Sequence, residues 1–243
     1  MTTALNDIGL VWVHGIFGHP AEFTPVVPYF TERGYWCHCV TLPAHGSQPS
    51  QHLGQTSHLE FVDHLRQEVA WAGQQCQRVC LIGHSLGGML SLAVAGSQPE
   101  ALCGVIALGA AFEEAYLLNP ALWLKAGWAR LRASLPYVPD YWHGNDRPRL
   151  PLKHLKHFRQ QGTDLLSHLQ TQLPNITVPT LLGHSPYDLS VPYEEMHKLY
   201  HVLHEAGVPV TTFTLEQCGH QIFPLSKGQT ATLAAIQRFV EKL

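Results

Sequence analysis

Short apolar runs alternate with amphipathic stretches along most of this chain. Six apolar runs predict buried strands, at residues 8–13, 35–42, 78–82, 104–108, 178–182 and 208–215. Apolar residues spaced by three and four predict helices at 57–72, 89–95, 192–206 and 233–243. Strands that alternate with helices in this way predict a mostly parallel sheet with helices on both faces.

The first long helix shows the pattern in detail. Ser57 and Glu60 have the spacing of a capping box, in which each side chain binds the backbone of the other residue. Five apolar residues follow at helical spacing and are expected to form one buried face: Leu59, Val62, Leu65, Val69 and Ala72.

Residues 113–175 interrupt the alternation of strands and helices. They contain amphipathic stretches at 122–135 and 152–173, joined by the segment 136–148, and none of them reads as a strand. We therefore expect a helical lid, or cap, inserted between two parts of one core, 1–112 and 176–243. The lid holds eight Lys or Arg and five Asp or Glu, so its net charge is +3 within a chain of net charge −3. This positive charge is explained either by a solvated basic face or by attraction to an anionic partner.

The composition narrows the class of protein. Hydrophobic residues make up 45% of the 243 residues and charged residues 14%, which is typical of a globular domain. The net charge of −3 argues against a general nucleic-acid binder. We find no secretion signal and no apolar run near the roughly 20 residues that span a bilayer. We expect a cytoplasmic protein without stable membrane insertion, whose oligomeric state the sequence leaves open.

The pentapeptide Gly83-His84-Ser85-Leu86-Gly87 lies between a predicted strand and a predicted helix. A serine with glycine two residues before and two residues after it has the pattern of a nucleophile elbow. The turn is so tight that side chains at the glycine positions would collide with neighbouring chain. Such a turn presents the Ser85 hydroxyl at the carboxyl edge of the sheet, above a helix N-terminus that favours developing negative charge.

A serine nucleophile needs a base, and the base needs an acid that holds its tautomer. Asp188 follows the predicted strand 178–182 and is the expected acid; Glu113 or Glu114 is the alternative. His220 follows the last predicted strand and is the expected base.

Two other histidines and a second serine are set aside. His84 flanks Ser85 and cannot also deprotonate it, and His14 is expected to orient its loop by hydrogen bonding. Ser185 follows Gly-His as Ser85 does, but Tyr187 stands where the second glycine is needed.

Two backbone N–H groups are needed to hold the oxyanion of an acyl-transfer reaction. We expect one from Leu86, directly after the nucleophile, and one from the glycine-punctuated loop after the first strand. Ile16 is the preferred donor in that loop, and Phe17 is the second choice.

Cysteine and histidine spacing does not favour a metal site. Cys37 and Cys39 would share one face of a strand, and no second ligand pair at zinc-like spacing accompanies them, so buried free thiols are the better account. His197, His201 and His204 share a helical face that a solvated surface explains. We therefore expect neither a metal nor a cofactor.

Five motifs together resemble the α/β-hydrolase family, in its carboxylesterase and monoacylglycerol-lipase-like branch. They are His14-Gly15, residues 43–47, residues 83–88, Asp188 before Val191-Pro192, and Gly219-His220. The resemblance implies the α/β-hydrolase fold, a Ser85–Asp188–His220 triad and oxyanion donors at Ile16 and Leu86. Ala44 departs from the glycine common at that position. The serine argues against the dehalogenase and epoxide-hydrolase branches, which the resemblance associates with aspartate there.

The leading hypothesis is a serine hydrolase that cleaves small-molecule carboxylic esters through an acyl-enzyme. Apolar lid residues favour an apolar acyl or alcohol group: Leu122, Trp123, Trp128, Tyr141 and Trp142. A thioesterase or acyltransferase for carrier-bound acyl groups is the alternative, suggested by basic lid residues at Arg147, Arg149, Lys153, Lys156 and Arg159. A non-catalytic ligand receptor on the same scaffold is a third reading.

Overall fold

The computed structural model describes residues 7–46, 53–113, 152–188, 190–216, 218–223 and 229–243. Within these residues the strands form one six-stranded sheet in the order β2-β1-β3-β4-β5-β6, and every neighbouring pair is parallel. The strands are β1 Ile8–Val13, β2 Trp36–Val40, β3 Arg78–His84, β4 Leu102–Leu108, β5 Thr180–His184 and β6 Val210–Thr214. All the predicted strands are therefore confirmed, and the parallel arrangement brings their carboxyl ends to one edge.

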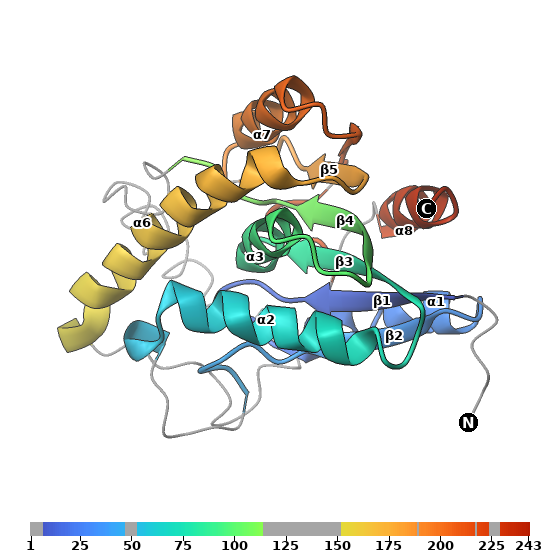
Figure 1. The fold of residues 1–243 in the computed structure, drawn as a ribbon. Coiled ribbons are helices and arrows are strands. Elements are labelled where there is room, and N and C mark those ends of the chain that lie inside the picture. Colours follow the sequence, from blue (N-terminus) through green and yellow to red (C-terminus); the bar gives the residue numbers. More distant parts are fainter. Residues whose placement is uncertain (1–6, 47–52, 114–151, 189, 217, 224–228) are drawn as a thin grey trace, which may run out of the picture.

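Helices cover both faces of the sheet (Figure 1). One face packs against α2 (His58–Ala72), α3 (Leu86–Gly96), α6 (Leu155–Gln172) and α7 (Glu194–Glu205). The other face packs against the 3₁₀ helix η1 (Pro20–Phe23), α1 (Val27–Thr31) and α8 (Gln229–Val240). Strand β1 supplies both cores in alternation, since Leu10 and Trp12 face one side while Val11 and Val13 face the other.

The chain changes direction across the sheet between β1 and β3. After β1 the chain adds β2 on one side, and β3 to β6 then follow on the other side. In open sheets of this kind, ligands bind at the carboxyl ends of the strands where the order reverses. The loop after β1 and the turn after β3 meet at that point, because Val13 lies opposite Gly83 in the register.

Helix α2 confirms the predicted capping box and corrects the predicted buried face. The Ser57 and Glu60 side chains each bind the backbone N–H of the other residue. Leu59, however, is 50% exposed, and Phe61 is buried in its place. The prediction for Leu59 was wrong because successive steps of three residues drift around a helix.

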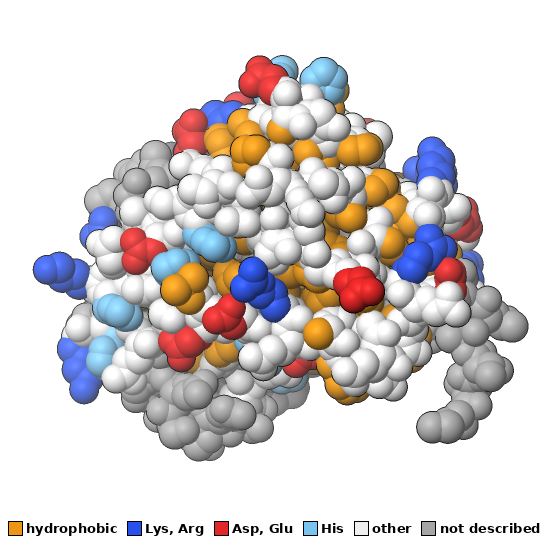
Figure 2. Space-filling model, in the orientation of Figure 1, with side chains coloured by type: hydrophobic (Ala, Val, Ile, Leu, Met, Phe, Trp, Pro, Cys, Tyr) orange, Lys and Arg blue, Asp and Glu red, His pale blue; other side chains and the backbone are white. Residues whose placement is uncertain are grey.

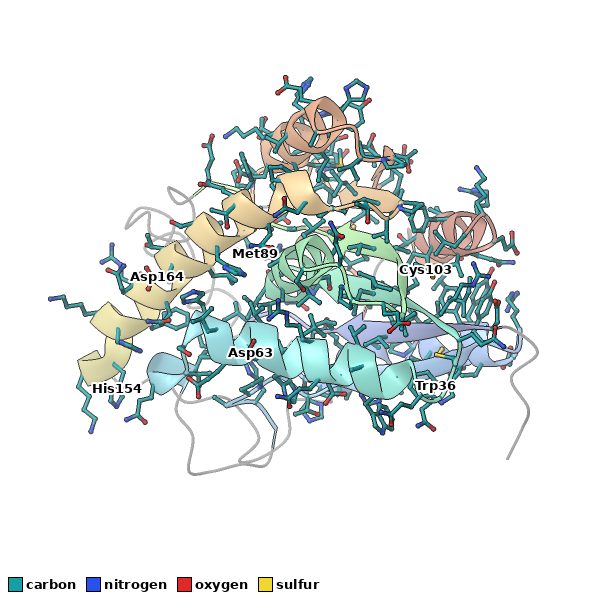
Figure 3. All side chains as sticks on the ribbon, viewed as in Figure 1. Trp36, Asp63, Met89, Cys103, His154 and Asp164 are labelled. Carbon is teal, nitrogen blue, oxygen red and sulfur yellow. The ribbon has the colours of Figure 1, made fainter. Side chains whose placement is uncertain are left out.

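Helix α6 matches the second helix predicted for the lid, and residues 122–135 and 136–148 lie outside the described residues. The C-terminal half of α6 is buried through Leu165, Leu166 and Leu169. At its C-terminal end it contacts α3 directly, since a Cβ on Gly96 would lie 2.4 Å from the backbone oxygen of Gln172. The N-terminal end extends away from the core, with His154 just before its first turn (Figure 3).

Candidate active site

The turn between β3 and α3 places Ser85 in a backbone conformation that side chains rarely adopt. Its φ is 54° and its ψ is −117°, and its N–H donates to the carbonyl of Leu108 at 2.8 Å. A Cβ on Gly83 would lie 2.2 Å from the carbonyl oxygen of Gly87, and a Cβ on Gly87 would lie 2.1 Å from that of Val13. The two flanking glycines are therefore required by close backbone packing, as the sequence pattern predicts.

The structure brings Ser85, Asp188 and His220 together at the carboxyl edge of the sheet. His220 Nε2 lies 2.9 Å from Ser85 Oγ, and His220 Nδ1 lies 2.7 Å from Asp188 Oδ2. Because Nδ1 faces a carboxylate, it carries the proton and donates it to Asp188. Nε2 then has a free lone pair to accept the Ser85 hydroxyl proton, which is the arrangement that a general base requires.

Asp188 is buried among hydrogen-bond donors. Its Oδ1 accepts the backbone N–H groups of Ser190 and Val191 at 2.8 and 2.9 Å. Its Oδ2 lies 3.2 Å from Nε2 of His184, besides its bond to His220. Burial alone would raise the pKa of Asp188, but the donors from His184, His220 and the backbone hold that pKa below its ordinary value. The carboxylate is therefore ionised.

The alternative acid at Glu113 is directed elsewhere. Its carboxylate lies 2.6 Å from the ammonium of Lys198, which also binds the buried carboxylate of Glu195 at 2.9 Å. Glu195 in turn accepts the backbone N–H groups of Phe112 and Glu113. Glu114 lies outside the described residues.

The two histidines set aside from the sequence bind backbone groups. His14 is buried; its Nδ1 donates to the carbonyl of Gly15 at 2.9 Å, and its Nε2 accepts the N–H of Leu42 at 3.2 Å. His84 Nε2 lies 2.8 Å from the backbone oxygen of His220. Each histidine therefore supports a loop at this edge of the sheet.

Ser185 is buried, and its hydroxyl is occupied by backbone partners. The hydroxyl donates to the backbone oxygen of Cys218 and accepts the N–H of Tyr187 at 3.1 Å. The side chain thus connects the Asp188 loop to the segment that carries His220. No local sequence pattern signals this contact.

The loop after β1 approaches Ser85 closely. A Cβ on Gly15 would lie 3.2 Å from Cβ of Ser85. The loop closes as a turn in which Gly18 N–H donates to Gly15 O at 3.0 Å, and Phe17 has a φ of 58°. Leu86 is the first residue of α3, where a helix leaves its N–H groups without intrahelical acceptors.

Apolar side chains surround this edge. Ile16, Phe17, Leu86 and Phe158 are partly buried against the core. The rings of Phe17 and Phe158 lie 6.1 Å apart, so α6 contacts the loop after β1. The lid residues Leu122, Trp123, Trp128, Tyr141 and Trp142 lie outside the described residues.

In the part of the chain that the structure describes, cysteines, possible metal ligands and the longest helices lend themselves to no further site. Cys37 and Cys39 are free and half-buried, and burial raises the pKa of Cys37 to about 11. Across the described ranges, no three His, Cys, Asp or Glu side chains are arranged to hold a metal ion. No helix among those ranges has the length and apolar character needed to cross a bilayer.

One known protein with a similar sequence is a lipase. The thermostable monoacylglycerol lipase of Bacillus sp. (strain H-257) is 28% identical over 108 residues, which cover 44% of this chain and 42% of the lipase. The matched segment thus spans less than half the length of this curated relative.

Two solved structures share the fold. The monoacylglycerol lipase of Paleococcus ferrophilus has a TM-score of 0.70 at 20% identity, covering 94% of this chain and 92% of that one. A thioesterase domain from the curacin biosynthetic pathway has a TM-score of 0.69 at 17% identity, covering 97% and 92%.

The model of the alpha/beta hydrolase family matches residues 10–235, which is nearly the whole chain. That match agrees with the parallel six-stranded sheet and the helices on its two faces. The chain belongs to the alpha/beta hydrolase family.

Proposed function

We propose that this protein is a serine hydrolase that cleaves carboxylic esters with an apolar acyl or alcohol group. The observation that carries the proposal is the pair of hydrogen bonds at His220, 2.9 Å to Ser85 and 2.7 Å to Asp188. These distances match those of a nucleophile, its base and the acid that orients the base.

In the proposed reaction Ser85 Oγ attacks the ester carbonyl while His220 Nε2 takes the hydroxyl proton. The backbone N–H groups of Ile16 and Leu86 hold the oxyanion of the tetrahedral intermediate. The C–O bond to the alcohol breaks, and the alcohol leaves with the proton from His220. Water, deprotonated by His220, then attacks the acyl-enzyme and releases the acid, which restores Ser85. Asp188 stabilises the imidazolium that forms in each half of the cycle.

Hydrolysis of p-nitrophenyl esters of increasing acyl length tests the proposal. Ser85→Ala should abolish turnover and labelling by a fluorophosphonate probe, which forms a bond only with an activated serine. Ser91→Ala is the matched control, because Ser91 lies on α3, the helix that follows Ser85, and within the described part of the chain its hydroxyl donates to the carbonyl of Gly87. Undiminished turnover in Ser85→Ala would refute the proposal, and a wild-type protein that resists the probe would favour the ligand receptor.

A thioesterase or acyltransferase for carrier-bound acyl groups is the second candidate. The observation that favours it is a basic segment formed by the 3₁₀ helix η4 (Leu152–His154) and the first turns of α6, where Lys153, Lys156 and Arg159 are exposed. Figure 2 shows Lys and Arg side chains projecting from this edge of the molecule, where α6 extends away from the core in Figure 1. Acyl carriers are acidic, so this face suits them.

Charge reversal separates the two candidates. Lys153→Glu with Lys156→Glu should raise KM for a carrier-bound thioester at least tenfold, and leave a small soluble thioester unaffected. If the variant hydrolyses the carrier-bound thioester with the same KM and kcat as the wild type, the second candidate is excluded.

A further inference from the structure

The side chain of His84 occupies a buried position directly behind the site. His84 and Glu22 are each only 4% exposed, and His84 Nδ1 lies 3.2 Å from Glu22 Oε1. The other ring nitrogen, Nε2, lies 2.8 Å from the backbone oxygen of His220. The ring therefore touches two acceptors, one on either side.

Hydrogen-bond chemistry places a hydrogen on Nε2, because a backbone carbonyl only accepts. Against an ionised Glu22 carboxylate, which also only accepts, Nδ1 would carry a hydrogen as well. Burial alone would lower the pKa of His84, but Glu22, the His220 carbonyl and the charge of Asp188 raise it above its ordinary value. His14 also faces the ring and is neutral, as its own hydrogen bonds require. These contacts favour an imidazolium–carboxylate pair.

This pair connects three segments that are remote in the sequence. Glu22 belongs to η1, which follows the loop after β1; His84 ends β3; and His220 lies in the segment after β6. Asp188 binds the His220 ring, but it does not hold the His220 backbone. The residue before His220 is Gly219, which restricts the backbone little. Among the residues that the structure describes, His84 is the one whose side chain binds the carbonyl of His220.

We propose that Glu22 and His84 form a positioning pair that holds the main chain of His220, so that its ring reaches Ser85. The inference rests on the proposed hydrolase function, in which His220 is the base. Glu22 keeps His84 charged and oriented, and His84 donates to the His220 carbonyl. Since a displacement of about 1 Å at a reacting group costs up to about 100-fold in rate, such a contact contributes to turnover without touching substrate.

The main test combines His84→Phe with Glu22→Gln. Phenylalanine retains the ring volume beside Phe223, and glutamine avoids leaving a buried carboxylate unpaired. We expect kcat per titrated active site to fall about 10- to 100-fold while KM stays within about twofold. His84→Gln in the same Glu22→Gln background should restore most of kcat, because its amide N–H reaches the same carbonyl.

A second histidine–glutamate pair in the chain supplies the control. His38 and Glu68 are 2.7 Å apart between β2 and α2, away from the site. His38→Phe with Glu68→Gln makes the same chemical changes there and should leave kcat per active site unchanged. The inference would be overturned if the His84 double variant kept the kcat of the wild type. It would also be overturned if the His38 double variant lost as much kcat as the His84 double variant.

Nuclear magnetic resonance of the ring nitrogens tests the pair without relying on turnover. In the wild-type protein both nitrogens of His84 should be protonated at neutral pH, and a neutral ring would overturn the inference even if no variant folds. In the His84 double variant, the Nδ1 proton of His220 should exchange with water at least tenfold faster. If the wild-type protein shows no ester turnover, the proposed function is refuted. The protonation of His84 and the exchange rate of the His220 Nδ1 proton would still decide whether the pair positions His220.

Discussion

His14 is a buried histidine that its hydrogen bonds keep neutral, and this predicts a loss of stability in mild acid. Its Nε2 accepts the N–H of Leu42, so a proton on Nε2 would set two N–H groups against each other. Burial, assisted by the proximity of His45, lowers the pKa of His14 from 6.5 to about 3. The folded protein therefore excludes a proton that the unfolded chain accepts.

The magnitude follows from the difference between the two pKa values. Each pKa unit corresponds to about 1.4 kcal/mol, so the whole difference amounts to about 5 kcal/mol, reached only below pH 3. Between pH 7 and pH 5 only the unfolded chain takes up the proton, and the free energy of unfolding falls by about 2 kcal/mol through His14 alone. This contribution is complete at neutral pH and is lost as the pH falls below 6.5.

Urea unfolding of the wild type and of His14→Gln at pH 7 and pH 5 measures this effect. The glutamine cannot titrate, so the wild type should lose about 2 kcal/mol more than the variant between the two pH values. Histidine resonances should also show that His14 does not titrate between pH 5 and pH 8 in the folded protein. The reasoning would be refuted if the wild type and His14→Gln lost the same free energy of unfolding between pH 7 and pH 5, within about 0.5 kcal/mol. A His14 ring that titrates near its ordinary pKa in the folded protein would refute it as well.

Three further substitutions test other parts of the structure. Gly87→Ala should lower the free energy of unfolding by more than about 3 kcal/mol and abolish turnover, because its Cβ would lie 2.1 Å from the Val13 oxygen. Gly88→Ala is the control: its Cβ would first meet Cβ of Ala110 at 3.1 Å, so the free energy of unfolding should fall far less. Equal thermal shifts for the two would contradict this. Ser57→Ala should lower the free energy of unfolding by about 1 kcal/mol without changing kcat, and an unchanged midpoint in urea would argue against the capping box. Asp188→Asn should lower kcat about 10⁴-fold with the fold intact, and a loss under tenfold would exclude its orienting role.

Features that depend on neighbouring residues were predictable from the sequence. The strands, the capping box and α6 rest on local patterns, and each is confirmed. The meeting of Ser85, Asp188 and His220 is also predictable from their order, because parallel strands end at one edge of the sheet. Their catalytic roles stay predictions until turnover is measured.

Leu59 shows where a local pattern is misleading. Successive residues of a helix turn by about 100°, so a step of three falls about 60° short of a full turn. Leu59 lies six residues before Leu65 and is therefore about 120° away from it around α2. Phe61 lies four residues before Leu65, within about 40° of it, and is buried.

The contacts of His84 show a different limit. Glu22 is 62 residues away from His84, and His220 is 136 residues away. No periodicity connects such positions, and η1, which carries Glu22, is too short for a periodic signal. These contacts follow from the packing of loops, which only the three-dimensional structure provides.

The backbone contact at Gly96 sets how closely the C-terminal end of α6 approaches α3. Nearer its N-terminal end, Gln161 accepts the backbone N–H of His58 at 2.9 Å, and the ring of Phe158 lies 6.1 Å from that of Phe17. α6 is therefore attached to the core at both of these places along its length. A substitution that displaces its N-terminal half would be transmitted through Phe158 and Phe17 to the loop beside Ser85.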